Sequence, residues 1–327
     1  MGRATSPFAA EVASTANRQM RPSQAITMER NRALHLVSIE NRLHYPIDSR
    51  TRCSHIPTIA HPAVILTRTT TMLRFPVTLV LLVCLGINVG LPATARTAGE
   101  LVDEAMKAEA QLDTRRALEL FQAAEKAGRA DAFVLQKIAR QYSDLMTELP
   151  TRDEKRAFAT QALEYSRRAA AVEPGNAVNI LSVAISLGKL ALVSDAGDKV
   201  RYSRMVREEA ERSLALDPNY AWAHHILGRW HHEVADLGTA SRAAVRFLFG
   251  GLPTASAAES VRHLERAVAL EPDELQHHLE LGFACLATED PVRAQEAFAR
   301  GLDMPSRAKH DDPAKARARA ALAKLKR

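Results

Sequence analysis

The chain has 327 residues, of which 46% are hydrophobic but only 5% are aromatic, so its core must be built from aliphatic side chains. Alanine and leucine with helical periodicity favour an all-α fold over a sandwich or barrel, which would need β-branched and aromatic runs. The formal charge of +6 does not predict nucleic-acid binding. Ten arginines and four acidic residues precede Arg96, which leaves 34 basic and 34 acidic residues in the rest of the chain.

Residues 1–71 show no sustained hydrophobic period, and we assign them no fold. At Met72 the sequence changes to MLRFPVTLVLLVCLGINVGLPATA, with a positive start, an apolar stretch and a small-residue cleavage site ending at Ala95. This pattern predicts a secretory signal peptide at 72–95, a true start at Met72, and an exported periplasmic or extracellular protein. A genuine N-terminal extension resembling a transit peptide and an uncleaved membrane anchor are the alternatives.

The remaining residues, 96–327, predict about five helix-turn-helix pairs. Asp113 caps the second helix of the first pair, and Pro150 lies in the loop of the second. The third pair joins NILSVAISLGKLALV to KVRYSRMVREEAERSLALDP, the fourth begins with AWAHHILGRWHHEVADLG, and the fifth is ELQHHLELGFACLATEDPVRAQEAFARGLDMP.

The fifth pair matches the tetratricopeptide pattern, with Leu281-Gly282, Ala294, Phe298 and Pro305 at the expected spacing. One such unit cannot bury its own apolar face, so stacked neighbours are required. They are indicated by closing prolines and by the small residue five positions before each. These residues are Pro174, Pro218 and Pro272, with Ala169, Ser213 and Ala267. Their uneven spacing predicts insertions within the repeats.

One such insertion, SRAAVRFLFGGLPTASAAES, interrupts the fourth pair. It is too apolar to remain in water, so we expect it to dock on the solenoid, or alternatively on a partner. In tetratricopeptide arrays the first helix of each pair lines a concave groove. In the third pair the residues expected at the groove are apolar, namely Leu181, Ile185 and Gly188. The segment from Phe247 to Phe249 is one candidate for filling that stretch of groove.

Four stretches resemble the regulator of microtubule dynamics proteins, a family whose helical domain is a divergent tetratricopeptide array. They are ALEYSRRAAAVEP, LALDPNYAWAHHILGRW, RAAVRFLFGGLPTASAAESVRHLERAVALEPDELQHHLELG and AFARGLDMPSRAKHDDPAKARARAALAKL. The resemblance covers about Ala132 to Leu325 and includes the apolar insertion in the penultimate repeat. It implies association with microtubules and spindle poles without catalysis. Because an exported protein would meet no tubulin, microtubules are expected as a partner only if the protein lies in the cytoplasm or cytoskeleton.

No phosphate-binding loop, nucleophile elbow, H-E-x-x-H motif or C-x2-C pair occurs in the sequence, so we expect no enzymatic activity and no cofactor. Paired histidines suggest metal binding, but His224 and His231 are seven residues apart, about 10.5 Å along a helix, so we expect no metal site there. Cys285 is expected to be a small buried apolar residue.

The final run, AKARARAALAKLKR, predicts a helix with one apolar and one basic face. We expect it to cap the solenoid, because a terminal repeat needs a polar outer surface. The alternative is contact between its basic face and an acidic surface, such as an anionic lipid or an acidic protein tail.

The function we predict is a non-enzymatic adaptor that binds a protein or peptide in the concave groove of the solenoid. In tetratricopeptide arrays the first helix of each pair lines this groove. An aromatic ring offers a large rigid contact and a guanidinium can bind a carboxylate through two hydrogen bonds. Packing within the fold is the alternative for Trp222, and pairing with a nearby acid is the alternative for Arg229. The groove positions are Gln136, Arg140, Trp222, His225, Arg229 and His232.

Overall fold

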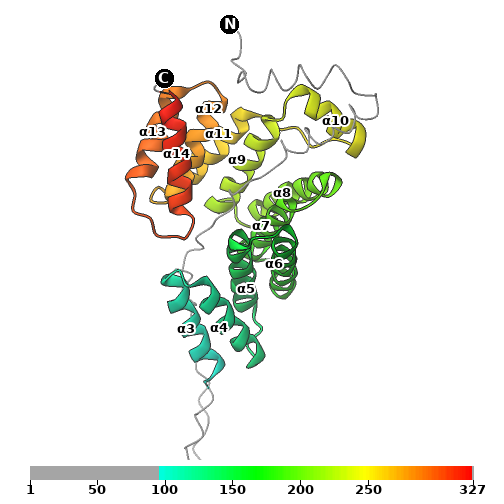
Figure 1. Cartoon of the computed structure of the whole chain (residues 1–327), viewed down its shortest axis with the longest axis vertical. Helices are drawn as coiled ribbons and strands as arrows, with labels where there is room; N and C mark the ends of the chain where they lie inside the picture. The colour runs from blue at the N-terminus through cyan, green and yellow to red at the C-terminus, as the bar shows by residue number, and fades with distance from the viewer. Residues whose placement is uncertain (1–95, 326–327) are drawn as a thin grey trace, which may run out of the picture. The chain divides into compact units, whose positions relative to one another are not determined.

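The structure is a computed structural model that describes residues 96–325, and within that range it contains twelve α-helices, one short 3-10 helix and no strand (Figure 1). The prediction of an all-α fold is confirmed. The predicted signal peptide at 72–95 and the segment 1–71 lie outside the described residues.

Ten of the helices form five helix-turn-helix pairs, as the closing prolines and turn residues predict. The two helices of each pair are in extensive contact. The pairs are α3 (Ala98–Ala110) with α4 (Thr114–Lys126), α5 (Ala132–Leu145) with α6 (Arg152–Val172), α7 (Ala177–Leu192) with α8 (Ala196–Leu216), α9 (Ala221–Ala235) with α11 (Ala257–Leu270), and α12 (Leu275–Ala287) with α13 (Pro291–Asp303).

Most of these helices begin at a side chain that accepts a hydrogen bond from a backbone N–H in the first turn. Thr151 forms a capping box with Glu154, whose carboxylate in turn accepts from the Thr151 backbone N–H. Asp113 caps α4, as predicted, and Asp290 caps α13 with Pro291 in the first helical position. Because these caps satisfy N–H groups that have no partner inside the helix, they fix where each helix starts.

Small residues allow the two helices of a pair to approach closely. A Cβ atom added to Gly282 would lie 2.5 Å from the ring of Phe298, and one added to Gly228 would lie 2.6 Å from Leu264. The small residues before the closing prolines, Ala169, Ser213 and Ala267, are completely buried. Large and small side chains therefore alternate across the helix contacts at the positions where the repeat pattern places them.

The pairs stack in chain order: the second helix of each pair contacts the first helix of the next. The first helices also touch one another, α5 with α7, α7 with α9, and α9 with α12. We call α5, α7, α9 and α12 the first-helix layer. This arrangement is the one expected of a tetratricopeptide-like solenoid.

Two segments fall outside the paired helices. The insertion forms α10 (Thr239–Phe249), which contacts α8. The last helix, α14 (Asp311–Leu325), packs on α12 and α13 with Ala314 and Ala318 buried, as expected of a capping helix. A short 3-10 helix, η1 (Met146–Glu148), follows α5.

Candidate partner-binding groove

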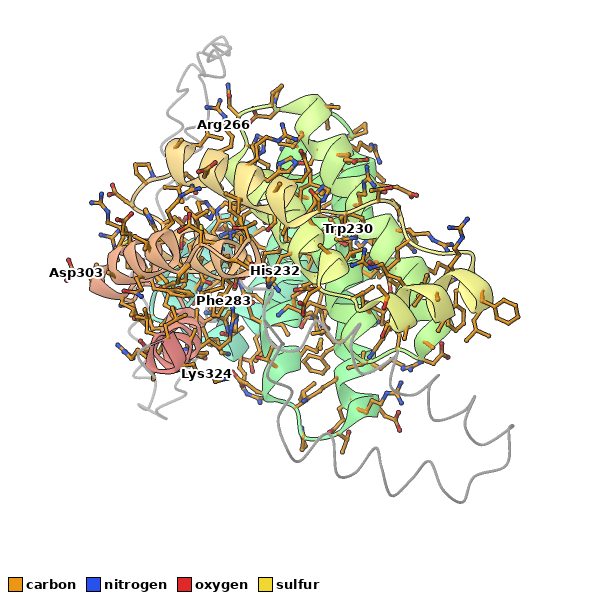
Figure 2. The ribbon with its side chains drawn as sticks, turned by 90° about the horizontal axis from the view of Figure 1, so that it is seen from above. Trp230, His232, Arg266, Phe283, Asp303 and Lys324 are labelled. Atoms are coloured by element: carbon orange, nitrogen blue, oxygen red, sulfur yellow. The ribbon has the colours of Figure 1, made fainter. Side chains whose placement is uncertain are left out.

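The six residues predicted to bind a partner lie on two helices of the first-helix layer. Gln136 and Arg140 belong to α5, and Trp222, His225, Arg229 and His232 belong to α9. In Figure 2, His232 of α9 and Phe283 of α12 lie toward the middle of the view, where these two contacting helices meet. The binding role of these residues stays a prediction.

Trp222 packs between histidines of two adjacent repeats. Its ring centroid lies 4.9 Å from that of His225 and 4.6 Å from that of His277 on α12, and only 2% of Trp222 is exposed. Nδ1 of His225 and Nδ1 of His277 are 2.9 Å apart. Burial lowers the pKa of both imidazoles, well below the usual value for His225, so both rings are neutral at physiological pH. Trp222 therefore joins two repeats, which is the packing role considered as its alternative.

Arg229 lies within a charged network that links α9 to the end of the chain. Its Nη2 donates to Oε1 of Glu233 at 2.7 Å, and its Nε lies 3.8 Å from Glu280 on α12. Arg317 of α14 donates to the other oxygen of Glu280 at 2.8 Å. Arg229 and Glu280 each expose only 3% of their side chains. Arg229 therefore pairs with nearby acids, which is the alternative considered for it in the sequence analysis.

A second charged network surrounds Arg140. Glu109 of α3 accepts from Lys137 at 2.8 Å and lies 3.2 Å from Arg140. Arg140 is also 3.8 Å from Asp144, one turn further along α5. Asp144 is buried, which would raise its pKa, but the hydrogen bond from His310 and the neighbouring positive charges outweigh burial and lower the pKa below its usual value. Asp144 is therefore an anion at neutral pH and supplies a fixed negative charge opposite Arg140 on the same helix.

The C-terminal segment, residues 304–325, covers part of the first-helix layer. Nε2 of His310 donates to Asp144 on α5 at 3.1 Å. Nζ of Lys309 donates to Oγ1 of Thr114 at 3.1 Å and also pairs with Glu148 of η1. On the other side, Gln276 of α12 donates to Asp311 at 2.9 Å. These contacts, which sequence analysis did not predict, explain why charged residues of this layer are buried.

The insertion docks on the solenoid, but it does so on α8 and leaves part of its apolar surface exposed. Val245 is buried, and Nε of Arg204 on α8 donates to the carbonyl oxygen of Gly251 at 2.9 Å. Phe247 is 88% exposed and Leu248 is 40% exposed. The expectation that residues 247–249 fill the groove beside Leu181 on α7 is wrong, because α10 contacts α8 and Phe247 stays exposed, while Leu181 is completely buried. The insertion therefore docks on the solenoid, as expected, but its apolar tip stays exposed.

Cys285 is buried among apolar neighbours in the last pair, as predicted, and burial raises the pKa of its thiol. In residues 96–325 we find no helix that combines the length and the hydrophobicity needed to span a bilayer.

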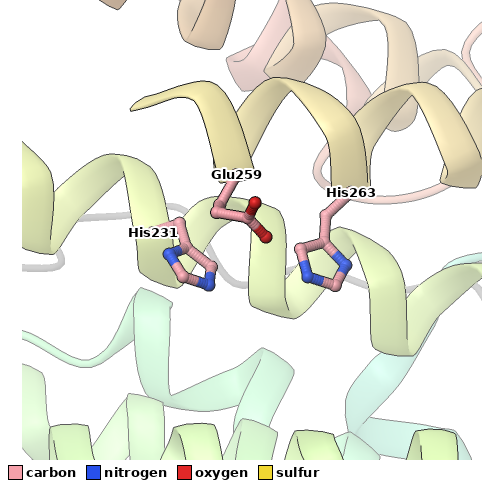
Figure 3. Close-up of side chains that lie close together, drawn as sticks. All are labelled: His231, Glu259 and His263. Atoms are coloured by element: carbon pink, nitrogen blue, oxygen red, sulfur yellow. The ribbon is translucent and has the colours of Figure 1, made fainter. Parts of the chain in front are cut away.

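Sequence reasoning overlooked one group of side chains that could hold a metal ion, made by His231, Glu259 and His263 (Figure 3). The pattern that could have revealed two of its three residues is Glu259 and His263 at positions i and i+4, which lie on one face of a helix. The third residue comes from α9, and its approach depends on how α9 packs against α11.

Comparison with known proteins gives both a family and a fold. A family model described as regulator of microtubule dynamics protein 1-3 matches residues 99–326. Similar proteins include regulator of microtubule dynamics protein 3 of Xenopus laevis, which is 30% identical over 138 residues covering 42% of this chain and 30% of that protein. Regulator of microtubule dynamics protein 1 of Bos taurus is 25% identical over 183 residues, covering 55% and 58%. The chain thus spans less than two thirds of the length of these relatives.

Among solved structures, a thermophilic TPR protein of Thermus thermophilus superposes with a TM-score of 0.51. The two sequences are 18% identical, and the match covers 69% of this chain and 99% of the other. At that identity the likeness shows the fold alone, and the fold it shows is the tetratricopeptide type.

Proposed function

Because this chain belongs to the regulator of microtubule dynamics protein 1-3 family and has a tetratricopeptide-type fold, we propose that it is a non-enzymatic adaptor. On this proposal, it binds an extended peptide or a partner helix along the first-helix layer. The observation that carries the proposal is the concentration of charged and aromatic side chains on one layer of helices. Charged and aromatic groups of this kind suit the recognition of a polar peptide.

The predicted groove residues divide into two kinds according to their exposure. Gln136, Trp222, His225 and Arg229 are buried and would shape the floor of the site. Arg140 and His232 are partly exposed and are the predicted residues that a partner would touch first.

The C-terminal segment would compete with such a partner. His310 and Lys309 hold it on the N-terminal side of the first-helix layer, through Asp144, Thr114 and Glu148. On this proposal, a basic or imidazole group of the partner peptide takes the place of Lys309 or His310 in these contacts. His310→Ala together with Lys309→Ala should therefore strengthen partner binding.

The test is affinity capture from the native compartment with the wild type and with Arg140→Ala plus His232→Ala. Loss of Arg140 leaves Glu109 paired with Lys137, so the variant keeps a counter-charge for that carboxylate. Arg201→Ala plus Arg212→Ala, on the exposed face of α8, is the matched control for removing positive charge. We expect a captured partner to be reduced at least tenfold in the groove variant alone. If the folded groove variant retains every partner, or if the purified protein turns over a substrate, the adaptor proposal is wrong.

Association with microtubules is a second candidate, because the family and its members are named for the regulation of microtubule dynamics. It applies if the protein lies in the cytoplasm or cytoskeleton. Co-sedimentation with polymerised tubulin tests it directly. Saturable binding that the groove variant weakens would identify tubulin as the partner, whereas no protein in the pellet would exclude this candidate.

We also propose that the protein is exported, with cleavage after Ala95. The motivation is the leader-like sequence at 72–95. Mass spectrometry of native protein should find a mature chain that begins at Arg96. Peptides from upstream of Met72 would contradict the predicted start, and an intact 72–95 segment in native protein would contradict cleavage.

A further inference from the structure

The side chains of His231, Glu259 and His263 converge between α9 and α11 (Figure 3). Each residue offers one ligand atom, and these atoms all lie within 4.8 Å of one another. Glu259 and His263 are one helical turn apart on α11, and His231 faces them from α9. His231 is buried, whereas Glu259 and His263 are partly exposed, so the group can be reached from solvent.

A chain of hydrogen bonds orients His263. Nε2 of His224 lies 3.1 Å from the carbonyl oxygen of Pro218, and a carbonyl only accepts, so this nitrogen carries a proton. A neutral imidazole carries only one N–H, so its second ring nitrogen is an acceptor. Nδ1 of His224 must then accept the 3.0 Å hydrogen bond that Nδ1 of His263 donates. The remaining nitrogen of His263, Nε2, is left with its lone pair.

This arrangement is the usual preparation of a histidine ligand in proteins. A metal-bound histidine normally donates its second N–H to a fixed acceptor, which sets its tautomer and its orientation. His224 and the Pro218 carbonyl supply such a fixed acceptor for His263. The seven-residue separation of His224 and His231 therefore does not preclude a metal site, because His263 from another helix lies near both.

The other two ligands have only weak or replaceable partners. Nδ1 of His231 accepts a long hydrogen bond, 3.4 Å, from the backbone N–H of Ser256. Glu259 is paired with Arg262, whose side chain is 68% exposed and can be released into solvent. Two arginines lie near the site, and each is paired with a carboxylate, Arg207 with Glu211 and Arg262 with Glu259. Releasing Arg262 leaves the negative charge of Glu259 to a bound cation.

We propose that His231, Glu259 and His263 bind a divalent transition-metal ion of the zinc type, with water as the fourth ligand. Two imidazoles and a carboxylate suit zinc, which binds them at about 2.0–2.1 Å in a tetrahedron, so that the ligand atoms end about 3.4 Å apart. The ligand atoms, now within 4.8 Å, therefore need to close by a little over an ångström. Side-chain rotation supplies this movement while α9 and α11 stay in contact.

The ion would connect the two helices of the only interrupted pair in the described part of the chain. The insertion with α10 separates α9 from α11 in sequence, so the chain itself holds them less directly than in the other pairs. An ion that binds the folded state and not the unfolded chain stabilises the fold. His231 is the neighbour of the predicted groove residue His232 on α9, but the metal proposal does not rest on partner binding.

The test is isothermal titration of the full chain with zinc sulfate after dialysis against a chelator. Wild type should bind zinc at a site that His231→Gln, Glu259→Gln and His263→Gln each weaken at least tenfold. His224→Ala removes the hydrogen-bond acceptor of the His263 nitrogen that does not bind the ion. It should weaken zinc binding about tenfold, because loss of the hydrogen-bond partner of a metal ligand typically costs about 10–100-fold. His278→Gln is the matched control, because His278 hydrogen-bonds the Pro272 carbonyl as His224 does that of Pro218, but lies outside the cluster.

Four histidines within residues 1–95 could give additional zinc sites, and the variants separate these from the proposed one. Cobalt substitution provides a second measurement, because a tetrahedral site gives visible absorption that Glu259→Gln should alter without unfolding this partly exposed position. Loss of one site in the three ligand variants, with the control unchanged, supports the proposal. No zinc binding by wild type, or equal binding by wild type and all three ligand variants, overturns it.

Discussion

Replacing Gly282 with alanine tests the close helix contact on which the last pair depends. The new Cβ atom would lie 2.5 Å from Cδ1 and Cε1 and 2.9 Å from Cγ of Phe298. Phe298 is completely buried in the core formed by α11, α12, α13 and α14. Its rigid ring cannot move aside without displacing a neighbouring side chain or separating the two helices.

The expected cost follows from two opposing effects. Overpacking a filled core costs about 1–3 kcal/mol. Alanine is a better helix former than glycine by about 1 kcal/mol, which offsets part of that cost. Subtracting the second effect from the first, we expect Gly282→Ala to lower the free energy of unfolding by up to about 2 kcal/mol.

Urea denaturation followed by circular dichroism measures this change. Gly99→Ala is the control, because an added Cβ atom there meets only the Thr97 hydroxyl at 3.9 Å, and it should not destabilise the protein. Adding Phe298→Leu to Gly282→Ala should give less destabilisation than the sum of the single changes, since leucine leaves room for the methyl group. Additive costs, or a Gly282→Ala variant that is more stable than wild type by about 1 kcal/mol, would refute the close-contact explanation.

Three further predictions concern other parts of the solenoid. Burial raises the pKa of Glu274 to about 7, so the folded state binds its proton more tightly than the unfolded state, and stability falls as pH rises from about 4.5 to 7. Glu274→Gln should thus stabilise the protein by about 1–3 kcal/mol at pH 8 but little at pH 4. Thermal melts at both pH values measure this difference. As the control, Glu164→Gln at an exposed position should change neither melt. Trp222→Ala should cost about 3–5 kcal/mol in urea denaturation, because it removes a buried ring that joins two repeats; a cost below 1 kcal/mol would show that the ring is not a packing element. Thr151→Ala should cost about 1 kcal/mol by removing the capping box of α6, and an unchanged urea midpoint would contradict that role.

The repeat architecture could be predicted because its signals are local and recur. Closing prolines such as Pro218 and Pro272 mark the ends of second helices, and turn residues such as Asp290 fix where the next helix begins. The glycine at 282 was readable as a close contact because it falls at the small position of the tetratricopeptide pattern. Each of these features depends on residues within one repeat.

The burial of the predicted groove could not be predicted from the same signals. His310 reaches Asp144 across 166 positions in the chain, and no periodicity specifies such a contact. Similarly, the repeat register places Arg229 on the first-helix layer, but its pairing with Glu280 depends on how two repeats stack. The cluster at His263 required both a helical spacing, which is visible in sequence, and the packing of α9 on α11, which is not.

The most direct test of the adaptor proposal places a photo-crosslinking amino acid at position 232, on the first-helix layer, and separately at position 164, on the exposed side of α6. Both proteins are irradiated in the native compartment, and the products are identified by mass spectrometry. The proposal predicts one recurrent protein product at position 232 that is absent at 164 and increases when His310→Ala and Lys309→Ala loosen the C-terminal segment. Crosslinks that are equal at the two positions, or no crosslink at 232 in either background, would contradict it.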